Sequence, residues 1–189
     1  MTVRDVLSIG HPALRAPALE VPHCEIASER TQGIVDDLID TMRHANGAGL
    51  AANQIGETAR IVVIEVNDNP RYPYKPPIEL TVAINPELQV LDDETVVINE
   101  GCLSVPLRGD VVRSVKLRVR YFDREGIEHC TYARGLTAGT WQHECDHLDG
   151  VLITDRADPS TLCTWDEFER HHRDAFIERI TRFNQRLAS

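Results

Sequence analysis

The chain has 189 residues, with thirty Asp and Glu against twenty Lys and Arg, so its formal net charge at pH 7 is −10. Hydrophobic residues make up 42% and charged residues 26%, a balance that favours a folded domain with its own core over intrinsic disorder. The acidic character disfavours sequence-independent binding to nucleic acid or to an anionic membrane.

The first part of the chain predicts an arm, a helix and a strand. Residues 1–27 are rich in proline and small residues, and we expect an irregular arm. Apolar residues recur at helical spacing over 28–46, where Ser28 can cap the amino end. Residues 60–66 predict a short strand, and 67–77, with four prolines, predict a loop.

The middle of the chain predicts β-structure. Residues 80–85 and 87–99 are strand candidates, with Asp92-Asp93 inside the second range. Apolar and basic residues alternate over 111–122, which indicates a strand with one solvent-facing side. The sequence Asp-Arg-Glu-Gly then predicts a turn into residues 127–133, so a hairpin is expected there.

Two helices are expected in the last third of the chain. Residues 136–149 form one helical segment that ends at Gly150. Thr164 and Glu167 form a capping box for a last helix, along which apolar residues recur every three to four positions. Strands in the middle with helices on either side predict an α+β fold with a mainly antiparallel sheet.

The cysteines and the amino terminus indicate a compartment. The five cysteines form no CxxC pair, and the first residues contain no apolar run of signal-peptide length. The longest apolar stretch, residues 61–64, is far too short for a membrane span. We therefore expect a protein of the reducing cytoplasm, without a disulfide framework.

The strongest chemical signal is the HExxH motif that begins at His143. His143 and His147 are four residues apart in a predicted helix, so both imidazoles can reach one ion. Glu144 directly follows His143, so its side chain lies near the ion but to one side of the two imidazoles. This position suits a general base acting on a water molecule that the ion activates. Taken alone, the motif is also compatible with a polar helix face and two uninvolved histidines.

Two further segments carry candidate site residues. A catalytic HExxH site needs a third ligand, for which the candidates are Cys102, the other cysteines and the remaining histidines. A single cysteine is more often a small buried packing residue. In residues 47–54 the glycines let the backbone approach an extended ligand and Gln54 supplies a neutral donor, although a helix C-cap followed by a turn has the same composition.

In this order the three segments resemble the motifs of the peptide deformylases. That family shows GxGLAAxQ, EGCLS and HExDH followed by Leu-x-Gly, and this chain has GAGLAANQ at 47–54, EGCLS at 100–104 and HECDHLDG at 143–150. The likeness covers most of residues 10–156, including HPALR near the amino terminus. It implies one domain over residues 1–189, with antiparallel sheets packed around a central metal-binding helix and a C-terminal helix over 164–189.

The resemblance also implies a chemistry. Cys102, His143 and His147 would hold one divalent ion, Fe²⁺ in most members, although Zn²⁺, Ni²⁺ or Co²⁺ also suit such a set. Glu144 would move the protons, and the Gln54 amide with the Leu103 backbone N–H would stabilise the oxyanion. The reaction implied is removal of the formyl group from the N-terminal methionine of newly made polypeptides, with release of formate.

Candidate substrate-binding residues follow from the same resemblance. They are Ala48, Gly49, Leu50, Glu100, Gly101, Arg108, Leu136, Gly139 and Thr140. Arg108 is matched to the family's peptide-contacting arginine across a segment one residue shorter than the family pattern. Gly139 and Thr140 stand where bulkier apolar residues often wall the methionine pocket. We therefore expect a wider or more polar pocket and a relaxed preference for methionine.

Other functions share parts of this pattern. A related amidase could act on a specialised formylated molecule, and an HExxH metalloprotease would cut internal peptide bonds, although the HExxHxxGxxH extension is absent. A non-catalytic metal-binding module would not need Glu144. No DNA or membrane partner is expected. The basic residues Arg179, Arg182 and Arg186 indicate either a ribosome contact or an ordinary solvated helix face.

Overall fold

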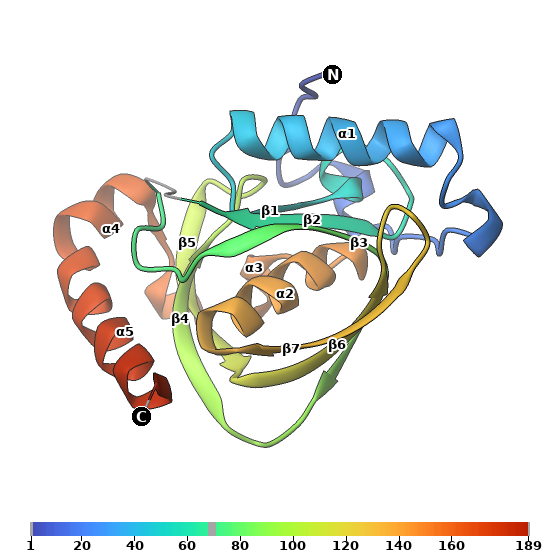
Figure 1. The fold of residues 1–189 in the computed structure, drawn as a ribbon. Helices are drawn as coiled ribbons and strands as arrows, with labels where there is room; N and C mark the ends of the chain where they lie inside the picture. Colours follow the sequence, from blue (N-terminus) through green and yellow to red (C-terminus); the bar gives the residue numbers. More distant parts are fainter. Residues whose placement is uncertain (1, 68–70, 189) are drawn as a thin grey trace.

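The apolar segment at residues 61–66 forms the second strand of a five-stranded antiparallel sheet in the computed structural model, which describes residues 2–67 and 71–188 (Figure 1). The strand order in this sheet is β1-β2-β3-β6-β7, and a second, three-stranded sheet has the order β4-β5-β8. The larger sheet consists of β1 (Gly49–Ala51), β2 (Ile61–Val66), β3 (Ile78–Val90), β6 (Lys116–Phe122) and β7 (Glu128–Arg134). The smaller sheet consists of β4 (Thr95–Gly101), β5 (Leu107–Ser114) and β8 (Cys163–Thr164).

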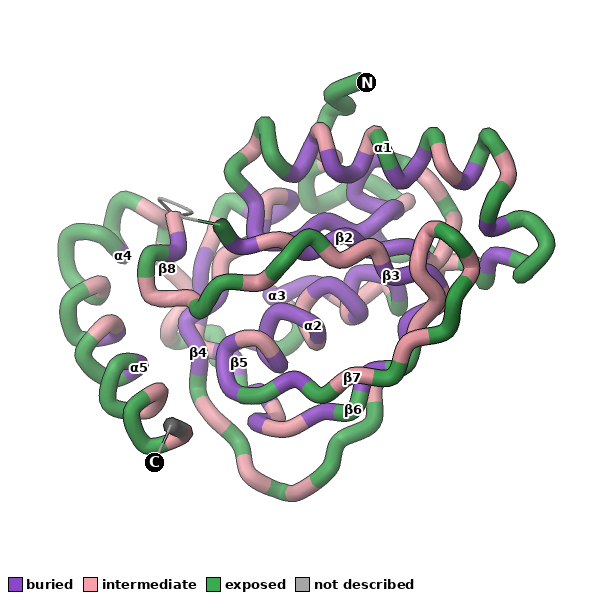
Figure 2. Tube along the Cα trace, viewed as in Figure 1, coloured by how far each residue is buried: buried purple, intermediate pink, exposed green. Residues whose placement is uncertain are grey.

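Strand β2 is buried on both faces because a helix covers each side of the larger sheet. Helix α1 (Glu29–His44) packs its apolar stripe against Ile61 and Val63. Helix α2 (Gly135–Leu148) packs against Val62 and Ile64 on the opposite face. The four consecutive apolar residues of β2 are therefore all core residues, as Figure 2 shows for this part of the trace. The predicted helix at 28–46 is confirmed, and Ser28 caps it by accepting a hydrogen bond from the backbone of Thr31.

Helix α2 lies between the two sheets (Figure 1). It contacts β1, β2 and β7 of the larger sheet and β5 of the smaller one. It ends at Leu148, before Gly150, which adopts a φ of +73°. The predicted α+β fold, with antiparallel sheets around this helix, is confirmed.

The carboxy-terminal part forms a separate layer on the smaller sheet. Helices α4 (Trp165–His171) and α5 (Arg173–Ala188) bring Phe168, Phe176 and Ile180 against Ile98 of β4. The predicted C-terminal helical segment is present, but it is divided into α4 and α5 at His172, whose φ is −123°. The break places the rings of Phe168 and Phe176 5.8 Å apart in one cluster.

Two strand predictions also need correction. The predicted interruption at Pro86 does not occur, because β3 runs through it at a bulge where its pairing passes from β2 to β6. A proline is tolerated at such an irregular position because no regular ladder bond is required of it. The predicted strand at 111–122 is two strands, since Val115 bonds to Glu94 and Gly135 where the chain crosses between the sheets.

The remaining elements are short. The amino-terminal arm is irregular apart from the 3₁₀ helices η1 (Pro12–Arg15) and η2 (His23–Glu25). Elsewhere lie η3 (Ala52–Ile55), α3 (Ile153–Arg156) and η4 (Pro159–Thr161). The described part of the predicted loop at 67–77 contains no helix or strand, and residues 68–70 lie outside the described residues. No helix in the described ranges has the length and apolar character required to cross a membrane.

Candidate metal and active site

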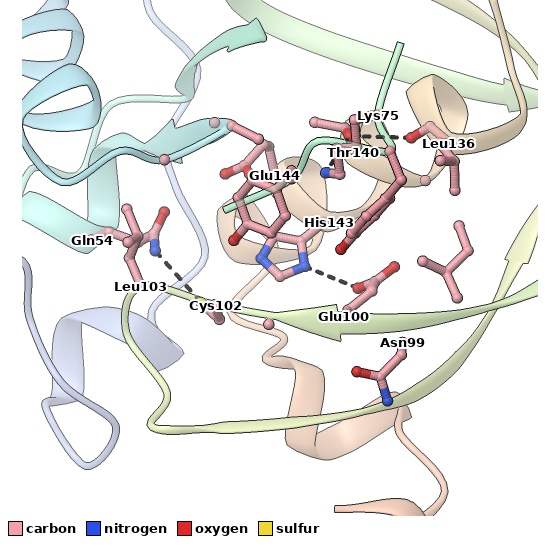
Figure 3. A pocket seen from close by; sticks show the side chains of 18 residues that line it. Gln54, Lys75, Asn99, Glu100, Cys102, Leu103, Leu136, Thr140, His143 and Glu144 are labelled. Atoms are coloured by element: carbon pink, nitrogen blue, oxygen red, sulfur yellow. Dashed lines mark hydrogen bonds and ion pairs between the residues drawn. The ribbon is translucent and has the colours of Figure 1, made fainter. Parts of the chain in front are cut away.

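The three predicted metal ligands meet where the end of β4 approaches α2, and Figure 3 shows two of them, Cys102 and His143. The helical spacing of His143 and His147 brings their ring centroids to 5.1 Å. Cys102 directly follows β4, and its Sγ lies 3.2 Å from Nε2 of His147. One ligand atom from each of the three residues lies within 4.8 Å of the other two. A thiolate with two imidazoles is a donor set for Zn²⁺, Fe²⁺ and similar ions, so these residues fit a metal site.

A buried ion pair orients the first histidine. Nδ1 of His143 donates to Glu100 at 3.0 Å, which leaves Nε2 of this ring for a metal ion. Glu100 accepts two further hydrogen bonds from Arg113, at 2.7 and 2.8 Å, and Arg113 also donates to Asp146. Burial alone would raise the pKa of Glu100, but the guanidinium of Arg113 outweighs it and lowers the pKa to about 2. Glu100 therefore remains an acceptor for His143.

The ligands perturb one another strongly. Burial acts to raise the pKa of Cys102, yet the imidazoles of His147 and His143 hold it well below its usual range. Burial disfavours the charged form of His143, but hydrogen bonds to Cys102 and Glu100 raise its pKa well above the usual range. The site therefore stabilises a thiolate at Cys102, which is the form that binds a metal ion.

Glu144 points into the site and depends on a glycine for its position. The side chain is buried, and its Oε2 has no hydrogen-bond partner among the described residues. A Cβ atom on Gly49 would lie 2.6 Å from Cδ and 2.7 Å from Cγ of Glu144. Burial raises the pKa of this carboxyl group, against the neighbouring imidazoles. The buried and unpartnered oxygen is suited to a water molecule or a substrate group.

Gln54 and Leu103 flank the same space. The Gln54 side chain accepts from the backbone of Ala51 at 2.9 Å, so its NH₂ group faces the thiolate side and donates to Ser104 at 3.0 Å. Nε2 of Gln54 lies 3.7 Å from Sγ of Cys102. The backbone N–H of Leu103 has no acceptor within residues 2–67 and 71–188. Two neutral donors thus stand beside the ligand cluster.

A pocket opens next to this cluster, and most of the predicted residues line it. Its walls include all three catalytic candidates and, of the predicted substrate-binding set, Ala48, Gly49, Glu100, Gly101, Leu136, Gly139 and Thr140. Leu50 does not line the pocket, contrary to the prediction, because its side chain is fully buried in the core beneath α1. Glu100 reaches the wall, but its carboxylate is already engaged by Arg113 and His143.

Arg108 is also placed differently from the prediction. Its side chain is only 1% exposed, and its guanidinium lies between the rings of Trp165 and Phe168, at 4.0 and 3.9 Å. Nε of Arg108 donates to the Asn99 side chain at 2.9 Å. This position is behind the pocket wall, where it anchors α4 to the smaller sheet. A direct contact between Arg108 and a peptide does not fit this burial.

The structure shows what surrounds Gly139 and Thr140, the two residues behind the prediction of a wider or more polar pocket. A Cβ atom on Gly139 would lie 2.6 Å from Cδ1 of Ile98, so Ile98 occupies the space that this glycine leaves. The hydroxyl of Thr140 donates to the carbonyl of Leu136 at 3.1 Å and accepts from Nζ of Lys75 at 2.9 Å. The pocket therefore contains an amino group and a hydroxyl group at this position.

Several residues at the site have no counterpart among the predicted ones. Tyr72, Tyr74 and Lys75 line the pocket from the proline-rich loop, which no pattern connects to the motifs. Arg113 holds Glu100 with two hydrogen bonds, and the sequence pattern around Arg113 does indicate a buried partner. Arg113 stands in phase with Val111 and Val115, which places a charged side chain on the buried side of a strand and calls for a buried partner.

Comparisons with known proteins agree with this site. The family model described as "Polypeptide deformylase" matches residues 3–162. The peptide deformylase of Leptospira biflexa is 41% identical over 169 residues, which cover 88% of this chain and 94% of the relative. That of Bartonella tribocorum is 43% identical over 156 residues, which cover 82% and 84%.

Solved structures show the same fold. The Met-Ala-Ser-bound class I type b peptide deformylase from Acinetobacter baumannii superposes with a TM-score of 0.78 at 34% identity, over 82% of this chain and all of that one. The Thermotoga maritima peptide deformylase has a TM-score of 0.73 at 35% identity, over 84% of this chain and all of that one. Since the family model spans most of the chain and the ligand cluster is intact, this chain belongs to the peptide deformylases, the metal-dependent hydrolases that remove the N-formyl group from nascent polypeptides.

Proposed function

We propose that Glu144, Gln54 and Leu103 carry out the deformylation in this chain beside a divalent ion held by Cys102, His143 and His147. The observation that carries this proposal is the unpartnered carboxylate oxygen of Glu144 at the ligand cluster, with two neutral donors across the same space. When bound, a divalent ion acts as a Lewis acid and brings the pKa of water towards neutrality.

The side chains have separate tasks in the reaction. Glu144 takes one proton from the attacking water, whose oxygen forms a bond to the formyl carbon. Gln54 donates from Nε2 and Leu103 from its backbone N–H to the formyl oxygen as negative charge develops there. Glu144 then delivers the proton to the leaving nitrogen as the carbon–nitrogen bond breaks. The products are formate and a peptide with a free amino group.

Two residues behind the site keep this geometry. Glu100 accepts from Nδ1 of His143 and so fixes which ring nitrogen faces the site. Arg113, only 3% exposed, holds Glu100 with two hydrogen bonds and keeps it charged. We assign both as positioning residues.

For the ion and the substrate we propose Fe²⁺ and formyl-methionyl peptides, with residues 1–189 acting as one domain. The choice of Fe²⁺ rests on the family resemblance, since a Cys/His₂ set suits several ions. Met-Ala-Ser bound to the Acinetobacter relative supports a methionyl peptide as the product. Protein purified anaerobically should contain about one iron per chain by elemental analysis and release formate from formyl-Met-Ala-Ser. Inactive protein with metal bound would contradict the proposal.

We also propose that the protein works in the cytoplasm, because the thiolate of Cys102 requires a reducing compartment. Contact between the ribosome and the C-terminal helix stays a prediction. Arg179 pairs with Asp110, Arg182 with Glu178, and Arg186 with Glu94, so part of this basic charge is neutralised within the chain. Co-sedimentation with ribosomes before and after deletion of residues 179–189 tests the contact. Equal binding by a folded truncated protein would reject it.

A further inference from the structure

Residues 72–75 of the proline-rich loop bring a lysine to the pocket. Tyr72, Tyr74 and Lys75 all line the pocket, and Figure 3 shows Lys75 beside Thr140 of α2. Nζ of Lys75 donates to Oγ1 of Thr140 at 2.9 Å and lies 4.9 Å from the centre of the Tyr72 ring. The chain has only one other lysine, Lys116, on the far strand β6.

The ammonium group of Lys75 has donor capacity to spare. A lysine ammonium carries three N–H donors, and among the described residues only Thr140 accepts a hydrogen bond from it. Burial lowers the pKa of Lys75, and the charges of Glu100 and Glu144 act in the opposite direction. Remaining donors at a pocket wall require water or a ligand atom, because an unpaired buried donor is costly.

The location decides which part of a substrate would meet this group. In the proposed function the formyl group lies between Glu144 and the donors of Gln54 and Leu103. Thr140 and Leu136 precede Glu144 by one and two turns on α2, and all three residues line the pocket together with Lys75. We therefore place the first side chain of a formylated peptide beside the Lys75–Thr140 pair.

We propose that Lys75 is a specificity-determining residue that selects a first side chain ending in a neutral hydrogen-bond acceptor. The inference rests on the proposed function and concerns the class of substrate. Methionine sulfoxide is such a side chain, since oxidation gives the flexible thioether a polar oxygen. Norleucine has the length of methionine and no acceptor, so it would leave the ammonium donors unpaired when it displaces water.

A neutral acceptor fits better than an anionic one. The carboxylates of Glu100 and Glu144 already act on Lys75, and Glu144 lies on the same pocket wall. A substrate carboxylate would gain attraction from Lys75 but meet repulsion from Glu144. The pocket therefore favours a polar side chain without its own charge.

The test compares kcat/KM for three formylated tripeptides on the metal-loaded protein. They carry methionine, methionine sulfoxide or norleucine before Ala-Ser. We expect the wild type to prefer the sulfoxide over norleucine by about 10- to 100-fold, the effect of one hydrogen bond to a charged group. In Lys75→Met this ratio should fall to about one or reverse. Lys116→Met is the matched control and should keep the wild-type ratio.

An equal sulfoxide-to-norleucine ratio in wild type and Lys75→Met would overturn the inference while leaving the deformylase function intact. Faster turnover of a formyl-glutamyl peptide than of the sulfoxide would also overturn it. Absence of wild-type activity on the methionine peptide, with metal bound, would contradict the proposed function and this inference with it. If Lys75→Met does not fold, inhibition of the wild type by the unformylated product tripeptides tests the inference instead. The methionine sulfoxide tripeptide should then inhibit about tenfold more strongly than the norleucine tripeptide, and equal inhibition would overturn the inference.

Discussion

Gly49 has no side chain where the carboxylate of Glu144 lies, and a Cβ atom there would come within 2.6 Å of Cδ of Glu144. Real Cβ atoms do not approach so closely, so any other residue at position 49 must displace Glu144 or the strand β1. The glycine in the first motif thus has a direct steric relationship to the HExxH glutamate. It connects two segments that are almost a hundred residues apart.

Substituting this glycine should therefore impair catalysis more than stability. We expect Gly49→Ala to lower kcat/KM for formyl-Met-Ala-Ser by about 100-fold, because a shift of roughly 1 Å in a catalytic group has that order of effect. Gly33→Ala in α1 is the control, since a Cβ atom there meets nothing within 4 Å. Formate release with equal metal content measures the change. Wild-type activity in Gly49→Ala would show that the contact with Glu144 does not matter.

Removing one oxyanion donor should slow the chemical step. Gln54→Leu keeps a similar volume but loses the Nε2 donor, and kcat should fall by about 100- to 1000-fold. Gln89→Leu, on an exposed part of β3, should leave kcat unchanged. If kcat in Gln54→Leu stayed within a few-fold of the wild type, the assignment of this amide to the formyl oxygen would be wrong.

The buried ion pair behind His143 should be important for stability. Arg113→Met leaves the carboxylates of Glu100 and Asp146 without their guanidinium partner, and breaking a buried pair in this way typically costs about 3–5 kcal/mol. Arg118→Met, on the exposed face of β6, should change the free energy of unfolding by less than about 0.5 kcal/mol. Urea unfolding of both variants gives the comparison, and equal losses would contradict a special role for Arg113.

Metal removal should lower the melting temperature only when the ligand set is complete. A chelator removes the stabilisation that an ion gives by binding the native state. We expect a clear decrease in Tm for the wild type and for Cys130→Ala, whose cysteine is exposed. Cys102→Ala should start from a lower Tm and respond little. An equal response of Cys102→Ala and the wild type would exclude Cys102 as a ligand.

Local patterns were sufficient for most of the fold and for the metal ligands. The helix at 28–46, the strand at 60–66 and the HExxH helix each have a period that a short window reveals. The spacing of His143 and His147 fixes their common side within one helix. Cys102 needed the resemblance to a known family, because no local pattern distinguishes a ligand cysteine from a packing one.

The predictions fail where contacts between residues far apart in the sequence determine the structure. Pro86 is accommodated because β3 exchanges partners at that point, and the predicted strand at 111–122 is divided at Val115 because the chain changes sheets there. Arg108 is held by Trp165 and Phe168, which come from α4, about sixty residues away in the sequence. Lys75 reaches the pocket only through the path of an irregular loop. None of these relationships leaves a periodic trace in the sequence.

The most direct test of the account is formate release from formyl-Met-Ala-Ser by the iron-loaded wild type beside Glu144→Gln. Glutamine keeps the shape of the side chain but cannot take a proton from water, so general-base catalysis worth roughly 100- to 10,000-fold should be lost. We expect rapid formate release by the wild type and a decrease of that size in the variant, with equal metal content. Equal rates in the two proteins, or no release by the wild type with metal bound, would contradict it.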